Sequence, residues 1–392
     1  MLPGIGVFGT GNIVRVLVAC LRSKGFKVEA IWGRTLEVAA TLATELEIPF
    51  YTNLVDDVLL RKDVDLVYIV CPPNLHSQIA VKALGIGKHV VCDKPAGLSQ
   101  SEVLKMVRGA QYYPRLISIL GHGLRFLPAY VQMKKCIQDG YVGDITVCDV
   151  RIQCGSLVDD HYDWMCDDRM GGGVLTTIGS HIIDIISYIT AQKAIRVHGL
   201  VRTFQKTNSK INGIRQITSD DFCTFQMEMD DNALVTVTLN NHLPGQFVQE
   251  VLICGTKGRL VVRGGDLHGQ RNDSAKDTKE EVLYLDIEDL KQTPMDSKRL
   301  HTILPKPYMK GLIKMVNALK EAFAPLEEKH NWIKEPVAMA ASFDDGQYIQ
   351  AVIDAIRRSS MNKEWVKVEL LTEEPDPNPF LSAAIRRSTI SM

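Results

Sequence analysis

The sequence shows no strong excess of charge of either sign. Its 392 residues contain 45 Lys and Arg against 46 Asp and Glu, a formal net charge of −1 at neutral pH. A chain without a large positive field does not attract nucleic acid or an anionic membrane surface over a distance. We therefore expect a small, locally recognised molecule as the partner, with no nucleic acid and no membrane.

Paired cysteine motifs are also missing. The nine cysteines are scattered, and none forms the C-x-x-C pair that is typical of a zinc or dithiol site. A chain of this length predicts two or three domains of roughly 150 residues each, which bury enough apolar surface to need no disulfides. We expect reduced, mostly buried thiols and no metal site.

Long apolar runs are absent as well. No stretch of about 18 or more uninterrupted apolar residues occurs, so no transmembrane helix is predicted. The mostly apolar start, 1–21, is either a secretory signal peptide or a retained part of the fold. Retention is favoured because no basic segment precedes the run, glycines crowd it and Arg15 interrupts it. The expected location is the cytoplasm, with secretion as the alternative.

Strands and helices alternate through the first third of the chain. The predicted strands are short apolar or β-branched runs at 4–8, 27–32, 64–70, 89–92 and 116–121. The predicted helices lie at 14–24, 36–46 and 76–85. This alternation predicts an α/β fold with an N-terminal Rossmann domain, a doubly wound parallel sheet over residues 1–121.

A glycine turn separates the first predicted strand from the first predicted helix. In a dinucleotide-binding sheet such a turn brings a pyrophosphate against backbone N–H groups at a helix N-terminus, where a Cβ would obstruct. The cofactor-binding residues predicted here are Gly9, Thr10, Gly11, Asn12 and Ile13. The pattern is incomplete because Val14 stands where the motif has a third small residue, and an ordinary tight turn is the alternative.

The second predicted strand ends without a carboxylate. NAD-binding domains place Asp or Glu there to bind the ribose 2′-hydroxyl, whereas this chain has Arg34 and Thr35 after Trp32-Gly33. A guanidinium and a hydroxyl suit a 2′-phosphate through charge-assisted hydrogen bonds. The sequence favours NADP over NAD, unless Arg34 merely begins a solvated helix.

A longer motif spans residues 71–95. It reads C-P-P-N-L-H and, after a helical pattern, G-K-H-V-V-C-D-K-P. This resembles the Gfo/Idh/MocA family of oxidoreductases, in which a similar Pro/Asn/His segment precedes G-K-H-V and the tripeptide E-K-P. The resemblance implies that a set of motif residues lies at the cofactor, with a packed helix-start histidine as the alternative for His76. These residues are Cys71, Pro72, Asn74, His76, Asp93 and Lys94.

The family keeps its catalytic lysine at the position of Lys94, and Asp93 replaces the usual Glu. Lys94 follows a predicted buried strand at the carboxyl edge of the sheet, where open α/β sheets bind ligands. An ammonium there hydrogen-bonds a substrate hydroxyl and stabilises alkoxide character as hydride leaves carbon. The alternative is a surface lysine at a strand end. The segment 124–129 resembles the family's R-F-x-P entry into the second domain, where Arg125 contacts the cofactor or serves the hinge.

Residues 122–371 predict a second, α+β domain, and 372–392 a C-terminal tail. The predicted strands lie at 145–152, 195–203, 222–229, 233–239, 250–254, 259–262 and 364–371. A polar surface hairpin or loop is predicted at 263–281 and late helices at 305–323 and 338–357. The alternating pattern predicts a mainly antiparallel open sheet, consistent with the family's substrate domain. The resemblance implies a homodimer formed through this sheet.

Three glycines at 171–173 precede a helix with an apolar stripe. The family pattern is G-G-G-x-L-x-D-x-G-x-H, and this chain has Thr177 for the Asp and His181 for the His. Residues four apart share a helix face, so both should face the cleft. His181 is predicted to accept the hydroxyl proton because imidazole titrates near neutrality, with a satisfied buried histidine as the alternative. Asp184 is the candidate orienting partner, and Trp164 either lines the substrate site or packs in a loop.

Together these features predict an NADP-dependent oxidoreductase that moves hydride between nicotinamide and a sugar, polyol or related hydroxyl or carbonyl compound. Thr177 carries no charge, so the substrate or the activity differs from that of polyol-oxidising relatives. The alternative, motivated by Thr177 and Val14, is an NADP-binding regulatory or scaffolding protein without turnover. Within the family, segments 1–4 and 214–225 resemble the animal glucose-fructose oxidoreductase domain-containing proteins.

Overall fold

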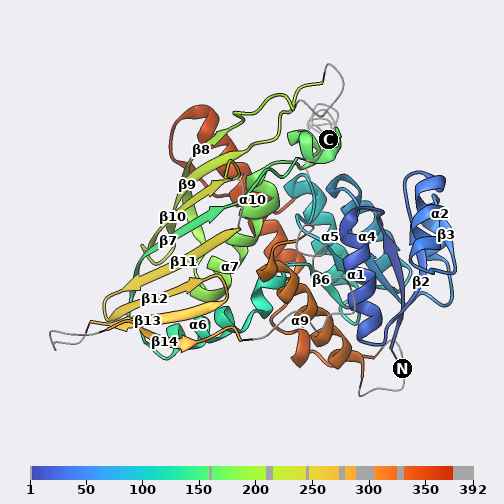
Figure 1. Cartoon of the computed structure of the whole chain (residues 1–392), viewed down its shortest axis with the longest axis horizontal. Helices are drawn as coiled ribbons and strands as arrows, with labels where there is room; N and C mark the ends of the chain where they lie inside the picture. The colour runs from blue at the N-terminus through green and yellow to red at the C-terminus, as the bar shows by residue number, and fades with distance from the viewer. Residues whose placement is uncertain are drawn as a thin grey trace, which may run out of the picture.

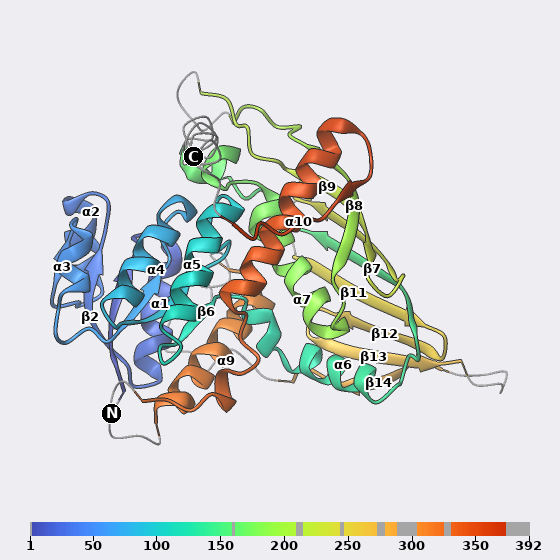
Figure 2. The same ribbon diagram turned by 180° about the vertical axis from the view of Figure 1, so that it is seen from behind.

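The computed structural model describes residues 2–158, 161–208, 215–243, 247–272, 279–287, 304–324 and 331–373. These residues form one sheet of six strands and one of nine. Helices cover both faces of the six-stranded sheet but one face of the nine-stranded sheet (Figures 1 and 2). We call the first sheet with its helices the N-terminal unit and the second the C-terminal unit. The predicted tail from 374 onwards lies outside the described residues.

The six-stranded sheet is entirely parallel. Its strands are β1 (Gly4–Phe8), β2 (Lys27–Trp32), β3 (Tyr51–Thr52), β4 (Leu66–Ile69), β5 (His89–Cys92) and β6 (Ser118–Leu120). Across the sheet the strands are ordered β3-β2-β1-β4-β5-β6. From β1 the chain first adds strands on one side, and from β4 it adds them on the other, so the switch point lies between β1 and β4. Ligands of doubly wound sheets bind at the carboxyl ends of the strands at such a switch point. The predicted Rossmann sheet is confirmed, with β4 and β6 shorter than predicted.

Five helices complete the connections between these strands. They are α1 (Asn12–Ser23), α2 (Leu36–Glu45), α3 (Val55–Leu59), α4 (His76–Gly85) and α5 (Gln100–Tyr112). The apolar stripe of α1, from Val14 to Leu21, packs into one core with Ile5 and Val7 of β1. Both β3 and α3 are too short to leave a periodic pattern in the sequence, and neither was predicted.

The nine-stranded sheet is antiparallel at every pairing except that of its strands Ile145–Gln153 and Leu234–Asn240. The strands are β7 (Ile145–Gln153), β8 (Ala194–Arg202), β9 (Phe222–Met229), β10 (Leu234–Asn240), β11 (Val248–Gly255), β12 (Gly258–Arg263), β13 (Asp266–Arg271), β14 (Glu281–Tyr284) and β15 (Val366–Lys367). The mainly antiparallel sheet is confirmed. The polar segment expected to be a surface hairpin or loop contains β13, which pairs antiparallel with β12 and β14, as in the hairpin alternative. The closing strand predicted at 364–371 was too long, because only β15 pairs there.

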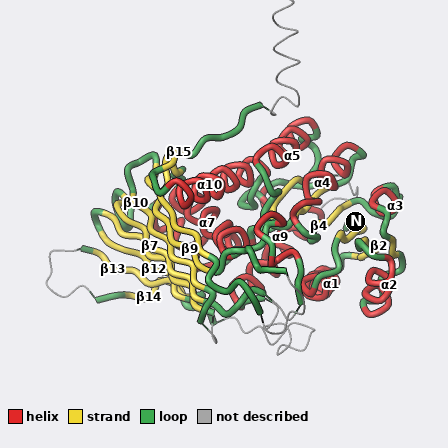
Figure 3. Tube along the Cα trace, turned by 90° about the horizontal axis from the view of Figure 1, so that it is seen from above, coloured by secondary structure: helices red, strands yellow, loops and turns green. Residues whose placement is uncertain are grey.

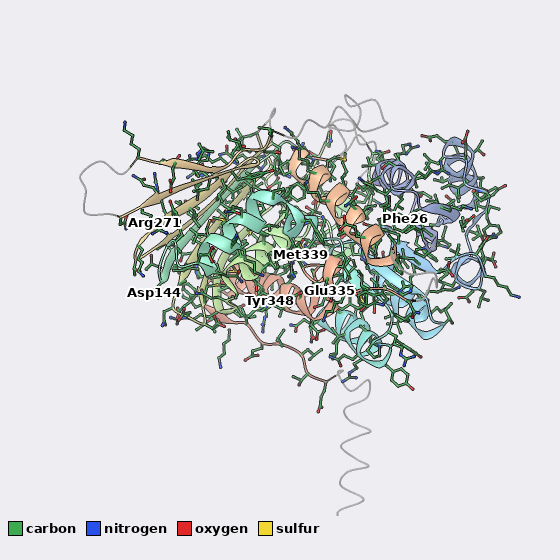
Figure 4. The ribbon with its side chains drawn as sticks, turned by 90° about the horizontal axis from the view of Figure 1, so that it is seen from below. Phe26, Asp144, Arg271, Glu335, Met339 and Tyr348 are labelled. Atoms are coloured by element: carbon green, nitrogen blue, oxygen red, sulfur yellow. The ribbon has the colours of Figure 1, made fainter. Side chains whose placement is uncertain are left out.

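Helices pack on the inner face of the large sheet and against the N-terminal unit. They are α6 (Pro128–Gln138), α7 (Ser180–Thr190), α9 (Lys306–Phe323) and α10 (Phe343–Asn362). Met315 and Leu319 of α9 join the core of the N-terminal unit, so the chain returns to its first sheet. α10 contacts both α5 and β8 and links the two units (Figure 3). Its Tyr348 lies beside the large sheet (Figure 4), where the hydroxyl accepts the Ala194 N–H at 2.8 Å.

One helical stretch, Asp168–Thr190, is long and apolar enough to span a membrane by length and hydropathy alone. Its apolar window is 94% buried inside the fold. The apolar stripe predicted for this helix is therefore used for packing, with Ile182, Ile185 and Ile189 in the core of the C-terminal unit.

Candidate active site

A cavity of about 940 Å³ lies at the carboxyl edge of the parallel sheet, between the two units. The segments that follow β1, β4, β5 and β6 supply one wall. Its members include Thr10, Gly11, Asn12, Ile13, Cys71, Pro73, Asp93, Lys94, Gly121 and Gly123. The C-terminal unit and α9 supply the other wall, which includes Cys154, Ser156, Leu157, His161, Asp163, Trp164, Met165, Thr177, Ile178, His181, Phe247 and Tyr308.

The glycine turn has the geometry that a nucleotide phosphate requires. Gly9 has φ +142°, and a Cβ there would lie 2.8 Å from the Val70 carbonyl oxygen. Gly11 precedes α1 and gives no side-chain cap, and a Cβ built on it would meet no atom within 4 Å. No side-chain cap and no acidic first-turn side chain therefore occupies the N-terminus of α1. An anion such as a pyrophosphate fits this helix N-terminus.

Arg34 and Thr35 follow β2 next to this turn. A Cβ on Gly33 would lie 2.6 Å from the Thr10 methyl group, which shows how closely the two loops approach. Both Arg34 and Thr35 are exposed, and neither lines the cavity itself. Thr35 is the residue before α2 and makes no side-chain cap bond. The nearest carboxylate in this segment is the exposed Glu37, in the first turn of α2.

Lys94 extends from the end of β5 into the cavity, across from the C-terminal unit. Its ammonium donates a hydrogen bond of 2.6 Å to the backbone carbonyl of Thr177. Burial lowers the pKa of Lys94, and the charge of Asp93 opposes that shift. The Asp93 carboxylate itself accepts the backbone N–H of Lys94 at 2.8 Å. Lys94 is thus a desolvated amine held between the two walls of the cleft.

Thr177 occupies a π-helical turn, Leu175–Gly179, that leads into α7. Such turns occur frequently at functional sites. The Thr177 hydroxyl donates to the Gly173 carbonyl at 2.6 Å. The Thr177 side chain is therefore bound to its own backbone, and Lys94 meets the neutral backbone carbonyl of this residue.

His181 lies one turn further along, against His122. The Nδ1 atoms of the two rings are 3.3 Å apart, and the His181 ring meets Tyr308 edge-on at 4.7 Å. Burial, Lys94 and His122 together hold the pKa of His181 well below its usual range. Burial also lowers the pKa of His122. His181 is therefore a neutral imidazole at neutral pH.

Sequence reasoning missed the place of His122, which it left at the domain junction. His122 follows the end of β6 by two residues, as Lys94 follows β5. Both side chains therefore reach the same edge of the sheet, and this matching offset was the available signal. The Nδ1 of His122 also lies 3.9 Å from the Asp184 carboxylate.

Arg125 and Asp184 lie behind the site and do not line the cavity. Arg125 Nε is 2.9 Å from the Asp184 carboxylate, and the guanidinium also bonds Asp345 at 3.3 Å. The Met339 carbonyl, near the middle of the molecule (Figure 4), accepts Arg125 Nη1 at 3.4 Å. Arg125, predicted near the cofactor or hinge, thus forms a buried ion pair with Asp184. Asp184 approaches His181 through His122 and not directly.

His76 is buried and ties two strand ends together. Its Nε2 lies 2.7 Å from the Cys71 carbonyl oxygen and its Nδ1 2.9 Å from that of Pro95. Burial lowers the pKa of His76, while the Cys71 carbonyl opposes the shift. The ring fixes the turn after Lys94, which agrees with the packed alternative. Cys71 lines the cavity, whereas Pro72 and the exposed Asn74 do not.

Trp164 lines the cavity from a short 3-10 turn, Trp164–Cys166. The preceding Asp163 accepts the Met165 N–H at 2.9 Å and so fixes this turn. Both sequence readings of Trp164 therefore describe the same segment, a capped loop at the cavity. Among the described residues, no group of three or more His, Cys, Asp or Glu side chains converges as it would around a metal ion.

Comparison with known proteins places this site in a family. Residues 4–119 match the "Oxidoreductase family, NAD-binding Rossmann fold", and residues 130–261 match the "GFO/IDH/MocA C-terminal domain". Two relatives are each 50% identical to this chain, and each match covers 100% of both sequences. They are "Glucose-fructose oxidoreductase domain-containing protein 1" of Xenopus tropicalis, over 394 residues, and "Glucose-fructose oxidoreductase domain-containing protein 2" of Homo sapiens, over 395 residues.

The fold also matches solved structures at low sequence identity. "Levoglucosan dehydrogenase, complex with NADH and levoglucosan" superposes with a TM-score of 0.78 at 19% identity, over 94% of this chain and 100% of that one. The two family matches agree with the fold, which has a parallel sheet with a glycine turn, a lysine at the edge of that sheet and a second, open sheet. The chain belongs to the GFO/IDH/MocA family of NAD-binding Rossmann-fold oxidoreductases.

Proposed function

We propose that this protein is an NADP-dependent oxidoreductase that transfers hydride between nicotinamide and a hydroxyl or carbonyl carbon. The observation that carries the proposal is the position of Lys94, a desolvated amine in a cavity that begins at the glycine turn. Sugars, polyols and related compounds are the first substrate classes to test, because the levoglucosan dehydrogenase that shares the fold is described with NADH and levoglucosan.

The N-terminal unit supplies the residues that would hold the dinucleotide. The turn from Gly9 to Ile13 would bind the pyrophosphate at the N-terminus of α1. Arg34 and Thr35, exposed beside this turn, would bind a 2′-phosphate and so favour NADP. When bound, the nicotinamide supplies or accepts the hydride.

Lys94 and His181 divide the work on the substrate oxygen. Lys94 hydrogen-bonds that oxygen and stabilises negative charge on it, as an ammonium does most effectively in a site of low dielectric constant. His181 is neutral because its pKa is held well below the usual range, so it is able to accept a proton. Its low basicity leaves most of the charge stabilisation to Lys94.

A second function is favoured by one specific observation. The hydroxyl of Thr177 is bound to Gly173, and its carbonyl accepts Lys94, so the lysine has a partner before any substrate arrives. A protein that binds NADP through the N-terminal unit and regulates a partner without turnover would tolerate this arrangement. Such a protein would gain thermal stability from the nucleotide by mass action alone.

One experiment separates the two functions. NADPH and NADH are titrated into the purified protein, and nicotinamide absorbance is then followed with a panel of sugars, polyols, ketones and aldehydes. The proposal expects tighter binding of NADPH and turnover with at least one compound. Nucleotide binding without turnover on any compound would overturn it and support the regulatory function. Equal affinity for the two nucleotides would overturn the preference for NADP.

We also propose that the chain forms a homodimer through the uncovered face of the nine-stranded sheet. Helices lie on the opposite face only (Figure 2). Four apolar side chains on the uncovered face, Val147, Leu200, Leu234 and Val248, are 36–44% exposed. A second copy would cover them. Light scattering on the eluting protein should give twice the chain mass, and the mass of a single chain would contradict the dimer.

The cytoplasm is the location we propose. All nine cysteines are free, and all except Cys254 are buried, as expected in a reducing compartment. Cleavage near Cys20 would remove β1 and the glycine turn from the N-terminal unit. Mass spectrometry of the cellular protein should therefore find peptides from residues 2–20. Their absence, together with secretion, would contradict this location.

A further inference from the structure

Two buried histidines, His122 and His181, form a pair beside the cavity. Their Nδ1 atoms lie 3.3 Å apart, and their rings meet edge-on with centroids 5.1 Å apart. His181 lines the cavity, whereas His122 is 1% exposed and does not line it. Because Nδ1 of His181 faces His122, Nε2 is the ring nitrogen that remains for a substrate oxygen.

One proton lies between the two Nδ1 atoms. A hydrogen bond between two imidazole nitrogens needs an N–H on one ring and a lone pair on the other. When His181 carries this proton, its neutral ring has a lone pair at Nε2 and accepts a proton there. When His122 carries it, Nδ1 of His181 is the acceptor and Nε2 carries the hydrogen. The position of this proton therefore decides whether His181 takes a proton from a substrate or gives one.

The charges next to the two rings favour a positive charge on His122 over one on His181. The buried Asp184 carboxylate lies 3.9 Å from Nδ1 of His122. His181 instead faces Lys94, and no carboxylate among the described residues opposes the lowering of its pKa. An opposite charge within about 4–6 Å favours the cation, and a like charge disfavours it. An imidazolium is therefore less costly at His122 than at His181.

Further titratable side chains lie around the pair on β5, α9, α10 and the segment after β6. They are Asp93, Lys94, Arg125, Tyr308 and Asp345. Asp93 raises the pKa of His122, whereas Lys94 and Arg125 lower it. The guanidinium of Arg125 is shared between Asp184 and Asp345. Among the described residues, Asp184 is the carboxylate within ion-pair distance of either ring.

We infer that His122 is the positioning residue of His181 and holds the proton that the reaction releases or takes up. This inference rests on the proposed function. In alcohol oxidation the substrate hydroxyl gives its proton to Nε2 of His181 as its carbon loses hydride to NADP and becomes a carbonyl. The Nδ1 proton of His181 passes to Nδ1 of His122, so His181 ends neutral and His122 becomes an imidazolium beside Asp184. Carbonyl reduction runs the same steps backwards.

Nitrogen NMR of the histidine rings locates the proton without any turnover. The full chain is labelled with ¹⁵N in histidine only, and the two rings are assigned by the signals lost in His122→Asn and His181→Asn. Ring ¹⁵N shifts distinguish a lone pair, a neutral N–H and an imidazolium. As the pH is lowered, we expect His122 to become the imidazolium while His181 stays neutral. A charge that forms on His181 first or equally on both rings, or a His122 that stays neutral until the protein unfolds, would overturn the inference.

Two substitutions of His122 test its part in turnover. The oxygen of His122→Asn accepts the His181 N–H but does not take its proton, and His122→Phe keeps a ring without an acceptor. We expect kcat/KM to fall by about tenfold in the asparagine variant and by about 100-fold or more in the phenylalanine variant. His198→Asn, on β8 away from the cavity, is the control. Unchanged kcat/KM in a His122→Phe variant that melts like the wild type would overturn the inference.

A proton inventory separates the relay from a merely structural role. When two protons move in one step, kcat/KM depends on the deuterium fraction of the solvent along a curve. We expect that curve in the wild type and a straight line in His122→Asn, where one proton moves. A straight line in the wild type would overturn the transfer to His122. If no compound turns over, the proposed function fails, and the NMR titration still decides which ring holds the proton.

Discussion

The two walls of the cleft use their polar groups in opposite ways. The N-terminal wall presents backbone N–H groups at Gly11 and the ammonium of Lys94 to the cavity. The C-terminal wall turns the hydroxyls of Ser156, Thr177 and Tyr308 into its own structure. The first wall suits an anionic dinucleotide and a proton transfer, and neither depends on the rest of the substrate. The second wall lies opposite Lys94, where a substrate would contact it.

The largest effect should come from removing the amine. Lys94→Ala should lower kcat/KM by about 10²–10⁴-fold, because positioned proton transfer and charge stabilisation contribute that range. NADPH affinity should stay within about threefold, since the turn and Arg34 are unchanged. Lys82→Ala, which removes an exposed lysine paired with Asp56, is the control. Unchanged turnover in Lys94→Ala would remove the lysine from the mechanism.

Two glycines of the turn separate folding from binding. Gly9→Ala requires an L residue at φ +142° and places Cβ 2.8 Å from a carbonyl oxygen, so the free energy of unfolding should fall by about 1–3 kcal/mol. Gly11→Ala meets no atom within 4 Å, so stability should hold. Its Cβ would obstruct the pyrophosphate and lower NADPH affinity by about tenfold. Chemical denaturation and nucleotide titration measure the two effects, and equal affinity in Gly11→Ala would contradict the phosphate site.

Arg34 tests the nucleotide specificity of the N-terminal unit. Arg34→Ala should weaken NADPH by about tenfold or more and leave NADH unchanged, because a charge-assisted hydrogen bond to phosphate is lost. Arg22→Ala, at the other end of α1, is the matched control. Isothermal titration calorimetry gives the dissociation constants of NADPH and NADH for the wild type and both variants. A similar loss for both nucleotides would show that Arg34 does not read the 2′-phosphate.

Thr177 tests how the walls meet. A carboxylate at this position in Thr177→Asp should raise the pKa of Lys94, which burial now lowers, because a nearby negative charge favours the ammonium form. Carbonyl reduction needs the protonated amine, so kcat/KM falls as the pH rises through the pKa of Lys94. In this variant the fall should move to higher pH. Thr177→Val adds no charge, so kcat/KM should fall at the same pH as in the wild type. A pH profile of kcat/KM that is the same in wild type and Thr177→Asp would show that a carboxylate at position 177 does not act on Lys94.

The smallest effect concerns the segment that holds the π-helical turn. Asp220 accepts the Leu175 N–H at 2.7 Å, and burial raises the pKa of this carboxyl to about 6. The folded state thus binds the proton more tightly than the unfolded state, and this contribution to stability falls as pH rises through about 6. Relative to Asp220→Asn, the free energy of unfolding of the wild type should fall by about 1 kcal/mol between about pH 5 and 8. Urea unfolding at each pH measures it, and parallel curves would contradict the raised pKa.

The sequence predicted much of the N-terminal wall because its signals are local. A strand, a glycine turn and a helix lie next to one another at 4–23, and Lys94 stands within one continuous motif. The C-terminal wall depends on distant contacts. The pairing of His122 with His181 joins residues 59 positions apart, and the Lys94 bond to Thr177 joins residues 83 apart.

Two other features had no local signal. The π-helical turn at Thr177 has the same apolar periodicity as the α-helix that follows it, so periodicity alone gives one helix. The return of α9 to the first core depends on tertiary packing of Met315 and Leu319, which are apolar residues of an ordinary amphipathic helix. Sequence patterns identify which faces are buried, but not against which partner.

Transfer of a label from nicotinamide to substrate tests the central claim most directly. NADPH carrying deuterium at the transferable C4 position is incubated with the protein and each carbonyl compound of the panel, and the alcohol is analysed by mass spectrometry. The account predicts deuterium on the carbinol carbon with wild type and at least about 10²-fold less with Lys94→Ala. Bound NADPH with no deuterium in any alcohol, across the whole panel, would contradict hydride transfer by this protein.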